Sequence, residues 1–208
     1  MQILITLYWS PQTRAARMFR ALEEVGQPYT LARIDIRSAN RNDPPDFLAA
    51  SPLRKVPAIT DSDVRVADSA AIALYLADRY APGDLAPRVD DPVRGEFLFW
   101  LFYTPSVMEP AMIEKFVHVP PNPSAYPWGS YERMLEALET RLSGREWIAA
   151  DRFTMADFMI SGTIEAMHRF KILDPSPVLS SYMERCFARP AAIRGREKEA
   201  EAIAALAG

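Results

Sequence analysis

The pattern of apolar and polar positions in the first part of the chain switches between strand-like and helix-like spacing. Segments with the length and pattern of strands are residues 3–9, 29–36, 56–60 and 64–67. Helical spacing of apolar positions occurs over 12–25, 45–50 and 69–80. Gly26 follows the first of these helices and Pro82 the last, as helix stop signals.

The order of these segments predicts a sheet that contains both parallel and antiparallel strands. A strand–helix–strand unit favours a parallel pair with a right-handed crossover. The short polar turn at 61–63 instead joins two strands as an antiparallel hairpin. We therefore expect a mixed sheet of about four strands flanked by helices over residues 1–80.

Strand signals disappear in the rest of the chain. A stretch rich in proline, glycine and aspartate over 81–90 is typical of a linker. Long helical patterns then cover 91–117, 128–143, 154–170, 177–188 and 190–206. The segment 119–128 contains too many prolines for a helix. The sequence thus predicts an α/β domain (1–80), a linker (81–90) and an all-helical domain (91–208).

Composition and charge narrow the classes of function. Hydrophobic residues make up 49% of the 208 residues, which is typical of a globular protein with a sizeable core. A net charge of −3 argues against a nucleic-acid-binding protein that depends on phosphate contacts. No apolar run approaches the roughly 20 residues that cross a bilayer, and the N-terminal stretch lacks the basic region of a signal peptide.

The few cysteines and histidines restrict the chemistry further. A single cysteine, Cys186, excludes an intramolecular disulfide and a Cys-x-x-Cys redox or zinc motif. The two histidines, His118 and His168, have no carboxylate partner at a spacing typical of a metal site. We therefore expect no metal, and a reducing cytoplasm is the simplest location.

Several polar residues stand where elements are expected to begin or end. Ser10 precedes Pro11, so that Ser10 has the pattern of a helix N-cap. Asp68 and Ser69 stand where the last strand meets the helix 69–80, and both residue types are favoured as helix caps. Pro57 falls inside a predicted strand, where a proline is normally confined to an edge.

Four stretches together resemble a known family along nearly the whole chain. They are "SPQTR" (10–14), "VPAI" (56–59), "ADSAAIALYLADRY" (67–80) and "FTMADF" (153–158), the last of which forms a capping box from Thr154 and Asp157. In this combination they resemble the cytosolic-type glutathione S-transferases, and "SPQTR" resembles the serine-type classes among them. The resemblance implies a thioredoxin-like first domain and a helical second domain that contributes a hydrophobic substrate pocket.

The resemblance also implies residues that bind glutathione. It places a cis peptide bond before Pro57, which would leave the backbone of Val56 free to pair with the cysteinyl part of the tripeptide. It places the γ-glutamyl carboxylate on Ser69 at the helix N-terminus, with Asp68 facing the ligand's ammonium group. Asp68 is a shorter side chain than the Glu or Gln of many relatives. We count Lys55 among the glutathione-binding candidates as well.

Ser10 is the candidate for the chemical step implied by the resemblance. Its hydroxyl would hold the sulfur of glutathione as thiolate, which is the nucleophile, rather than attack anything itself. A free thiol titrates near about 8.5, and a hydroxyl together with a helix end could lower its pKa by about one to two units. Thr13 is the second candidate and Tyr8 a third. A role of Ser10 as helix cap alone stays open.

The electrophilic substrate is not encoded in any motif. The resembling family lines its substrate pocket with the first helix of the second domain, which here contains Trp100, Tyr103 and Met112. Trp9, beside Ser10, is a further candidate. Aromatic residues at helical spacing are also typical of a protein core, so packing between elements is the alternative for each.

The leading hypothesis is therefore a cytoplasmic, homodimeric glutathione S-transferase that conjugates glutathione to a small hydrophobic electrophile, as in detoxification. Alternatives are a glutathione-dependent isomerase or dehalogenase, and a protein that binds glutathione or hydrophobic ligands without turnover. The loop after the first strand contains no cysteine, which argues against thiol–disulfide chemistry by the protein itself. A serine hydrolase is not expected, because no G-x-S-x-G motif occurs.

Overall fold

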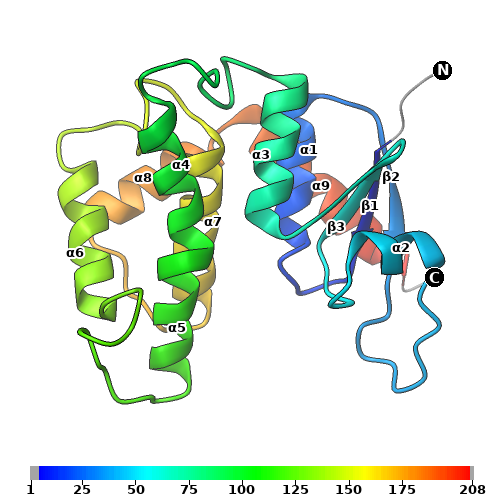
Figure 1. The fold of residues 1–208 in the computed structure, drawn as a ribbon, viewed down its shortest axis with the longest axis horizontal. Helices are drawn as coiled ribbons and strands as arrows, with labels where there is room; N and C mark the ends of the chain where they lie inside the picture. Colours follow the sequence, from blue (N-terminus) through cyan, green and yellow to red (C-terminus); the bar gives the residue numbers. More distant parts are fainter. Residues whose placement is uncertain (1–4, 207–208) are drawn as a thin grey trace. The chain divides into compact units, whose positions relative to one another are not determined.

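The computed structural model describes residues 5–206, which fold into two compact units. The first unit contains the chain up to Ala81 together with the segment from Arg189 onward, and the second contains Pro82–Ala188. Figure 1 shows the strands, α1, α2, α3 and α9 in the first unit and helices α4 to α8 in the second.

The sheet of the first unit contains four strands in the order β2-β1-β3-β4. Strand β1 pairs in parallel with β2, whereas the β1–β3 and β3–β4 pairs are antiparallel. The predicted mixed sheet is therefore confirmed, and residues 3 and 4 of its first predicted strand lie outside the described residues. The strands are β1 (Ile5–Trp9), β2 (Tyr29–Arg33), β3 (Ala58–Asp61) and β4 (Val64–Ala67).

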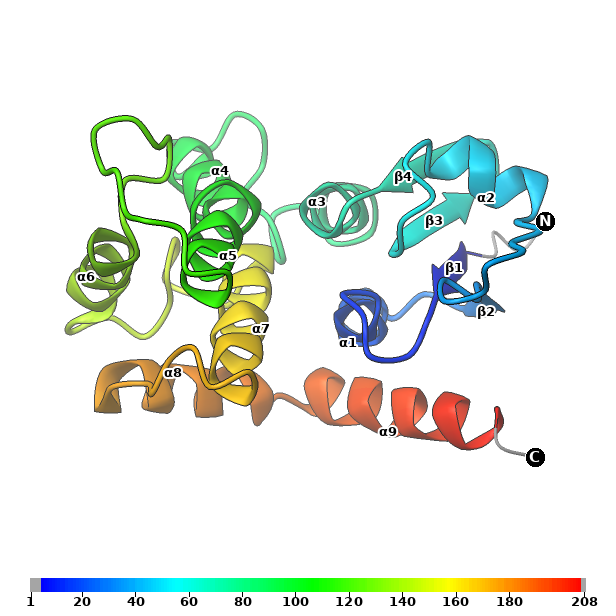
Figure 2. The same cartoon turned by 90° about the horizontal axis from the view of Figure 1, so that it is seen from below.

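Helices cover both faces of this sheet because side chains along β1 alternate between the two faces. Trp9 packs its ring edge against Phe19 of α1, with the ring centroids 5.2 Å apart. Tyr8 packs on the opposite face against Phe47 of α2, at a centroid distance of 5.4 Å. Figure 2 shows α1 and α3 on one side of the sheet and α2 on the other. These helices are α1 (Ala16–Val25), α2 (Pro45–Ala50) and α3 (Ser69–Tyr80).

The last helix, α9 (Pro190–Ala204), belongs to the first unit and packs on α1. This corrects the expectation that the helical domain extends to residue 208. The physical reason is a close approach: a Cβ atom added at Gly195 would lie only 2.6 Å from the Cα of Arg20. Glycine lets the backbones of α9 and α1 come together where any other residue would collide.

Ion pairs join the same two helices. Arg189 donates two hydrogen bonds to the carboxylate of Glu24, at 2.8 and 2.7 Å. Arg194 and Lys198 of α9 both pair with Glu23 of α1. Burial alone would raise the pKa of Glu23, but the hydrogen bonds from Lys198 and Arg194 outweigh it and hold that pKa below its ordinary value. Charge complementarity thus adds to the backbone contact.

The predicted linker 81–90 is packed structure rather than a free connection, and from Pro82 onward it belongs to the second unit. Leu85 and Ala86 are buried, and the N–H of Met155 donates to the carbonyl of Leu85 at 2.8 Å. Arg152 donates further hydrogen bonds to the carbonyls of Gly83 and Asp84. The prolines and glycine of this segment therefore shape a turn that side chains of the same unit hold in place.

The helix expected over 91–117 is interrupted. It forms α4 (Arg94–Tyr103), a π-helical turn (Thr104–Met108) and α5 (Glu109–Phe116). Pro105 has no N–H to continue the regular ladder, and the N–H of Glu109 reaches back five residues to the carbonyl of Thr104. The other helices of the unit are α6 (Tyr131–Leu142), α7 (Met155–Arg169) and α8 (Pro177–Phe187).

Helix α7 forms the centre of the second unit, in contact with α4 and α8. The predicted capping box is present: the side chains of Thr154 and Asp157 bond to backbone groups at the start of the helix. Asp157 is fully buried and also accepts hydrogen bonds from the Ile148 N–H at 2.8 Å and the Tyr182 hydroxyl at 2.9 Å. One carboxylate therefore ties the helix start to the preceding loop and to α8.

The contact between α9 and α1 predicts opposite effects for two glycine-to-alanine substitutions. Gly195→Ala should lower the free energy of unfolding by about 1–3 kcal/mol, because its Cβ would collide with backbone atoms of Arg20. Gly95→Ala in α4 meets nothing within 4 Å and should be neutral or stabilising by about 0.5–1 kcal/mol. Urea unfolding of both variants tests this. Equal stability of the two would contradict the close packing of α9 on α1.

Candidate functional site

One row of paired residues crosses three strands at one edge of the sheet. Tyr8 of β1 pairs with Ala58 of β3, and Ala58 pairs with Ala67 of β4. Ala58 is the first residue of β3, and Ala67 is the last of β4. The chain therefore leaves β1 and β4, and enters β3, at the same edge.

This geometry gathers the residues that the sequence singled out from three separate stretches. Ser10 follows β1, Pro57 precedes β3, and Ser69 comes two residues after β4. Neighbouring strands lie roughly 4.8 Å apart, so the three segments leave the sheet within roughly 10 Å of one another. The candidate site of the first unit is this edge, formed by residues 10–13, 55–57 and 68–69.

Ser10 is buried, with 4% of its surface exposed, but it is not a helix N-cap. Helix α1 begins only at Ala16, and its N-cap, Ala15, makes no side-chain capping bond. The intervening residues form turns, and Gln12 has a φ of 58°, which lies outside the range of a right-handed helix. The expectation of a helix from residue 12, capped by Ser10, is therefore wrong.

Thr13 holds the turn that follows Ser10. Its hydroxyl donates to the carbonyl of Ser10 at 2.7 Å and accepts a hydrogen bond from the N–H of Ala15 at 3.2 Å. A threonine hydroxyl has a single proton to donate. Because that proton is used within the turn, Thr13 shapes the loop around Ser10 and is a weaker candidate for holding a thiolate.

Tyr8 and Trp9 have core positions. Tyr8 belongs to the buried cluster beneath α2, which includes Ile34 and Phe47. Trp9 is 2% exposed and packs against Phe19. We therefore remove Trp9 from the substrate-pocket candidates, because its ring is buried within the core of the first unit. Tyr8 remains the third candidate for thiolate contact, after Ser10 and Thr13.

The peptide bond between Val56 and Pro57 is cis, as the resemblance implied. Within residues 5–206, no hydrogen bond joins the N–H or the carbonyl of Val56 to another backbone group outside the regular elements. Val56 itself is half-buried and Lys55 is exposed. The backbone of Val56 is therefore available to an extended peptide.

Side chains that the sequence analysis did not single out hold this segment. Buried Ser51 donates its hydroxyl proton to the carbonyl of Lys55 at 2.8 Å and accepts from the N–H of Lys55 at 3.0 Å. Asp43 binds both Arg41 and Arg54, and Arg41 also donates to the carbonyl of Arg54. Their signal in the sequence is weak, since they lie in irregular segments and the contacts of Arg54 join residues 11 to 13 positions apart.

Asp68 caps helix α3 from a strained backbone conformation. Its carboxylate accepts a hydrogen bond from the N–H of Ala70 at 2.9 Å. Its φ of 77° and ψ of 137° lie in a region that is essentially reserved for glycine. Strain of this kind costs about 1–3 kcal/mol and clusters at functional sites, where surrounding structure maintains it.

Ser69 follows with an unpartnered hydroxyl. The residue is 3% exposed, and its Oγ has no hydrogen-bond partner within the described part of the chain. A buried hydroxyl without a partner is destabilising by about 1–3 kcal/mol. It lies in the first turn of α3, where free N–H groups and the positive end of the helix dipole favour an anion.

The remaining candidates lie in the second unit and are largely buried there. Trp100 and Tyr103 of α4 pack against each other, with their ring centroids 5.0 Å apart. The Tyr103 hydroxyl donates to the carbonyl of Met134 at 3.0 Å, and burial raises the pKa of Tyr103 to about 12. This bond gives Tyr103 a structural role, whereas Met112 on α5 is half-buried.

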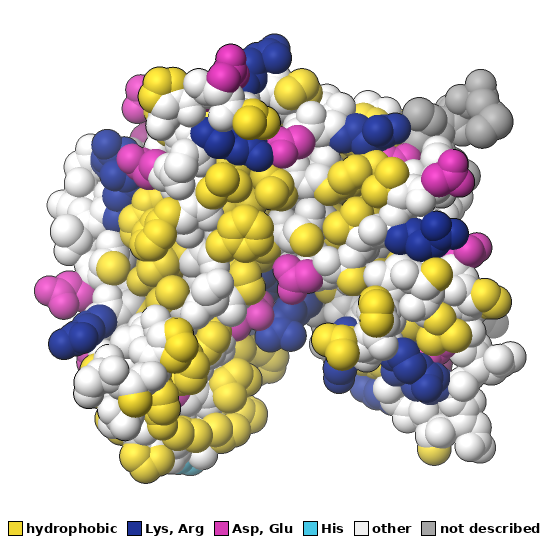
Figure 3. All heavy atoms as spheres, viewed as in Figure 1, with side chains coloured by type: hydrophobic (Ala, Val, Ile, Leu, Met, Phe, Trp, Pro, Cys, Tyr) yellow, Lys and Arg dark blue, Asp and Glu magenta, His cyan; other side chains and the backbone are white. Residues whose placement is uncertain are grey.

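Other apolar side chains of this unit are exposed instead. Figure 3 shows apolar atoms gathered over the helical unit, and the exposed residues of α4 and α5 include Phe99, Phe102, Ile113 and Phe116.

Among residues 5–206, no group of three or more histidine, cysteine, aspartate or glutamate side chains is arranged to hold a metal ion. No helix in the same range combines the length and the hydropathy needed to span a bilayer.

The cap and the strain at Asp68 predict different stabilities for three variants. Asp68→Asn keeps an acceptor for the Ala70 N–H and should unfold within about 0.5 kcal/mol of the native protein. Asp68→Ala should lose about 1 kcal/mol, because the cap is gone and the strain stays. Asp68→Gly should be more stable than Asp68→Ala, since glycine adopts this φ without cost. Thermal unfolding measures the order, and an alanine variant as stable as the native protein would disprove the cap.

Comparison with known proteins supplies the family. A family model of the glutathione S-transferase N-terminal domain matches residues 9–79, and one of the C-terminal domain matches residues 129–190. The chain is 28% identical to the disulfide-bond oxidoreductase YfcG of Escherichia coli strain K12, over 90% of this chain and 92% of that protein. It is 30% identical to a GST-like protein of Streptococcus mutans, over 91% of this chain and 79% of the relative.

A solved structure agrees with these matches. A glutathione transferase family member from Pseudomonas fluorescens, solved with two glutathione molecules bound, is 30% identical and superimposes with a TM-score of 0.72. The superposition covers 94% of this chain and 93% of that one. The mixed sheet of the first unit and the helices of the second are accordingly the thioredoxin-like and helical domains of this fold. The chain belongs to the glutathione S-transferase family.

Proposed function

We propose that the protein binds glutathione at the edge formed by residues 10–13, 55–57 and 68–69 and uses its thiolate to attack a small apolar electrophile. The observation that carries the proposal is the buried Ser69 hydroxyl at the start of α3, for which residues 5–206 supply no hydrogen-bond partner. A ligand carboxylate would accept a hydrogen bond from this hydroxyl and from the free N–H groups of the helix.

The proposed orientation of glutathione follows from the groups along the rest of the edge. Its γ-glutamyl carboxylate lies on Ser69, and its ammonium group faces the carboxylate of Asp68. The cysteinyl part then runs beside the backbone of Val56, whose N–H and carbonyl are available for pairing. In this orientation the sulfur lies toward Ser10, the residue that follows the neighbouring strand.

With glutathione in this orientation, the proposed reaction is a nucleophilic substitution by its thiolate. Ser10 donates its hydroxyl hydrogen bond to the sulfur and stabilises the thiolate over the thiol. The thiol proton passes to solvent, a carbon–sulfur bond forms, and the leaving group departs with its electron pair. Helix α1 begins too late for Ser10 to be its cap, so the hydroxyl carries more of the stabilisation than the sequence suggested. Which electrophile reacts is not specified by any of these residues.

A second candidate function is reduction of disulfides by glutathione, which the name of the Escherichia coli relative favours. Two glutathione thiols would reduce one disulfide to two thiols and leave as oxidised glutathione. The solved relative from Pseudomonas fluorescens, with two glutathione molecules bound, is compatible with such a reaction. The only cysteine of the chain, Cys186, is buried in α8, so both reacting thiols would come from glutathione.

Three further expectations accompany the proposal. A homodimer remains expected from the family resemblance, and the exposed apolar residues of α4 are compatible with one. A cytoplasmic location agrees with the single free cysteine. Glutathione-dependent isomerisation, dehalogenation and binding without turnover remain the alternatives to conjugation.

The proposed role of Ser69 predicts that its replacement by alanine weakens glutathione binding without lowering the free energy of unfolding. Ser69→Ala removes a hydroxyl that has no partner, so its free energy of unfolding should be unchanged or higher by about 1 kcal/mol. Glutathione affinity should nevertheless fall about tenfold, because a hydrogen bond to a charged group is lost. Calorimetric titration with glutathione measures this, with Ser181→Ala on the exposed surface of α8 as control. Unchanged affinity, or no binding by the native protein, would overturn the proposed site.

Ser10 is tested by the titration of bound glutathione, followed through thiolate absorbance. In the native protein the thiol pKa should lie about one to two units below its free value of about 8.5. In Ser10→Ala it should return toward 8.5, whereas Thr13→Val should keep the lower value because the Thr13 proton already serves the Ser10 carbonyl. A low value that persists in Ser10→Ala but is lost in Thr13→Val would transfer the role to Thr13.

A further inference from the structure

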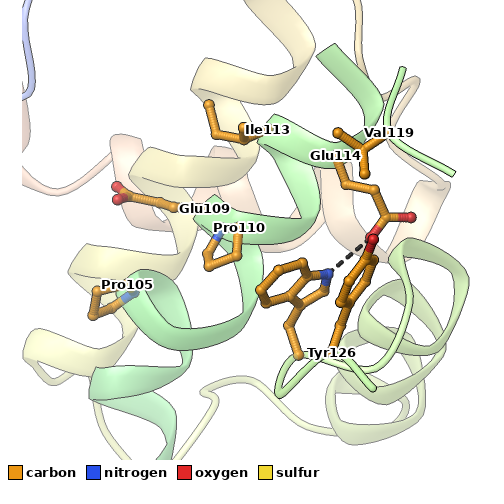
Figure 4. Close-up of a pocket in the computed structure, with 8 residues that line it drawn as sticks. Pro105, Glu109, Pro110, Ile113, Glu114, Val119 and Tyr126 are labelled. Carbon is orange, nitrogen blue, oxygen red and sulfur yellow. Dashed lines mark hydrogen bonds between the residues drawn. The ribbon is translucent and has the colours of Figure 1, made fainter. Parts of the chain in front are cut away.

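The second unit contains a pocket that the proposed function does not use. It lies between the π-helical turn, helix α5 and the segment 119–128, and has a volume of about 420 Å³ (Figure 4). This volume falls within the range of small-molecule binding sites. Its walls are largely apolar and include Pro105, Pro110, Ile113 and Val119.

A buried carboxylate lines the same pocket. Glu114 of α5 is 5% exposed, and its Oε2 accepts a hydrogen bond from the indole N–H of Trp128 at 2.8 Å. The adjacent cation, Lys115, is paired with Glu132 instead. Across residues 5–206 no lysine, arginine or histidine forms an ion pair with Glu114. A cation beside this carboxylate would gain a Coulombic attraction that is stronger in a largely apolar pocket than in water.

Two aromatic rings stand beside the carboxylate. Tyr126 and Trp128 stack with their centroids 4.7 Å apart and their planes at 25°. Figure 4 shows Tyr126 close to Glu114, and Glu109 at the other end of the pocket. Ring faces attract organic cations, and this attraction is stronger where water is excluded.

The aromatic pair is held in place by its own loop. The Tyr126 hydroxyl donates to the carbonyl of Pro120 at 3.3 Å, and the Tyr126 N–H donates to the carbonyl of Asn122 at 2.9 Å. The bond from Trp128 to Glu114 then fastens the loop to α5. Carboxylate and rings are thus fixed relative to each other before any ligand arrives, which reduces the entropic cost of binding.

We propose that this pocket binds a small apolar molecule with a permanent positive charge, of the aryl-alkyl quaternary ammonium class. The cationic head lies against Glu114 and the Tyr126–Trp128 pair. The apolar body lies against the prolines and Ile113. A quaternary ammonium suits the site better than a primary amine, because it needs no hydrogen-bond acceptors and is weakly hydrated. The inference uses no part of the glutathione site.

The test compares a cation with its neutral isostere on the native full-length protein, without glutathione. The probes are benzyltrimethylammonium and 2,2-dimethylpropylbenzene, which share their shape and differ by the charge. Ligand-observed NMR titration should show at least about tenfold tighter binding of the cation. Equal affinities, or no detectable binding of the cation, would overturn the proposal. Neither result depends on whether the protein binds glutathione.

A matched pair of variants tests whether Glu114 is the charge that favours the cation over its neutral isostere. Glu114→Gln keeps an oxygen for the Trp128 indole but removes the charge, so the preference for the cation should disappear while the neutral probe binds as before. Glu136→Gln, on an exposed position of α6 outside the pocket, should retain the full preference. A preference that survives Glu114→Gln would overturn the role of Glu114. If that variant does not fold, the comparison of the two probes on the native protein still decides.

Discussion

The register of three strands is the constraint on which the candidate site depends. Tyr8, Ala58 and Ala67 form one row across β1, β3 and β4. The chain therefore leaves β1, enters β3 and leaves β4 at the same edge of the sheet. A shift of β1 by one residue against β3 would turn its side chains to the opposite faces, moving Tyr8 off the α2 side and Trp9 off the α1 side. The cores on the two faces of the sheet therefore hold the site in register, although none of its polar groups belongs to them.

The parts of the fold that follow from regular patterns were predictable from the sequence. The four strands, the hairpin at 61–63 and the capping box of α7 depend on local spacing and on residues next to one another. The start of α1 was not predictable in this way, because Pro11 satisfies the rule for a first helical residue. The left-handed backbone at Gln12 and the Thr13 turn override that rule. Contacts between segments far apart in the sequence are harder to predict. The sequence signal for the packing of α9 on α1 is a single glycine, Gly195.

The same division applies to the candidate site. Four site residues were predictable because each stands at a junction between elements, where its residue type favours a cap or a turn: Ser10, Pro57, Asp68 and Ser69. Ser51 and Asp43 hold the segment before Pro57. Their roles were not predictable from the sequence, because irregular segments have no periodic pattern of apolar and polar residues. The unsatisfied Ser69 hydroxyl could be recognised only once burial was known. Residue type identifies candidates for binding, and three-dimensional surroundings show which of them lack a partner.

Both units keep polar groups that the fold leaves incompletely paired. Among the described residues, the buried Ser69 hydroxyl of the first unit has no hydrogen-bond partner, and the buried Glu114 carboxylate of the second forms no ion pair. Each of these lowers the stability of the ligand-free protein and would contribute to affinity when a ligand of complementary chemistry binds. One favours an anion and the other a cation, so the two sites select ligands of opposite charge.

The place of α9 has a consequence for biosynthesis. Chains emerge from the ribosome N-terminus first, and domains generally fold as they appear. Here the first unit lacks a helix until translation has passed through all of Pro82–Ala188, since α9 comes after that whole segment. During that interval the surface of α1 that receives Gly195 is uncovered and available to chaperones or to neighbouring chains. The unit whose synthesis starts first is thus completed only after the whole second unit has been made.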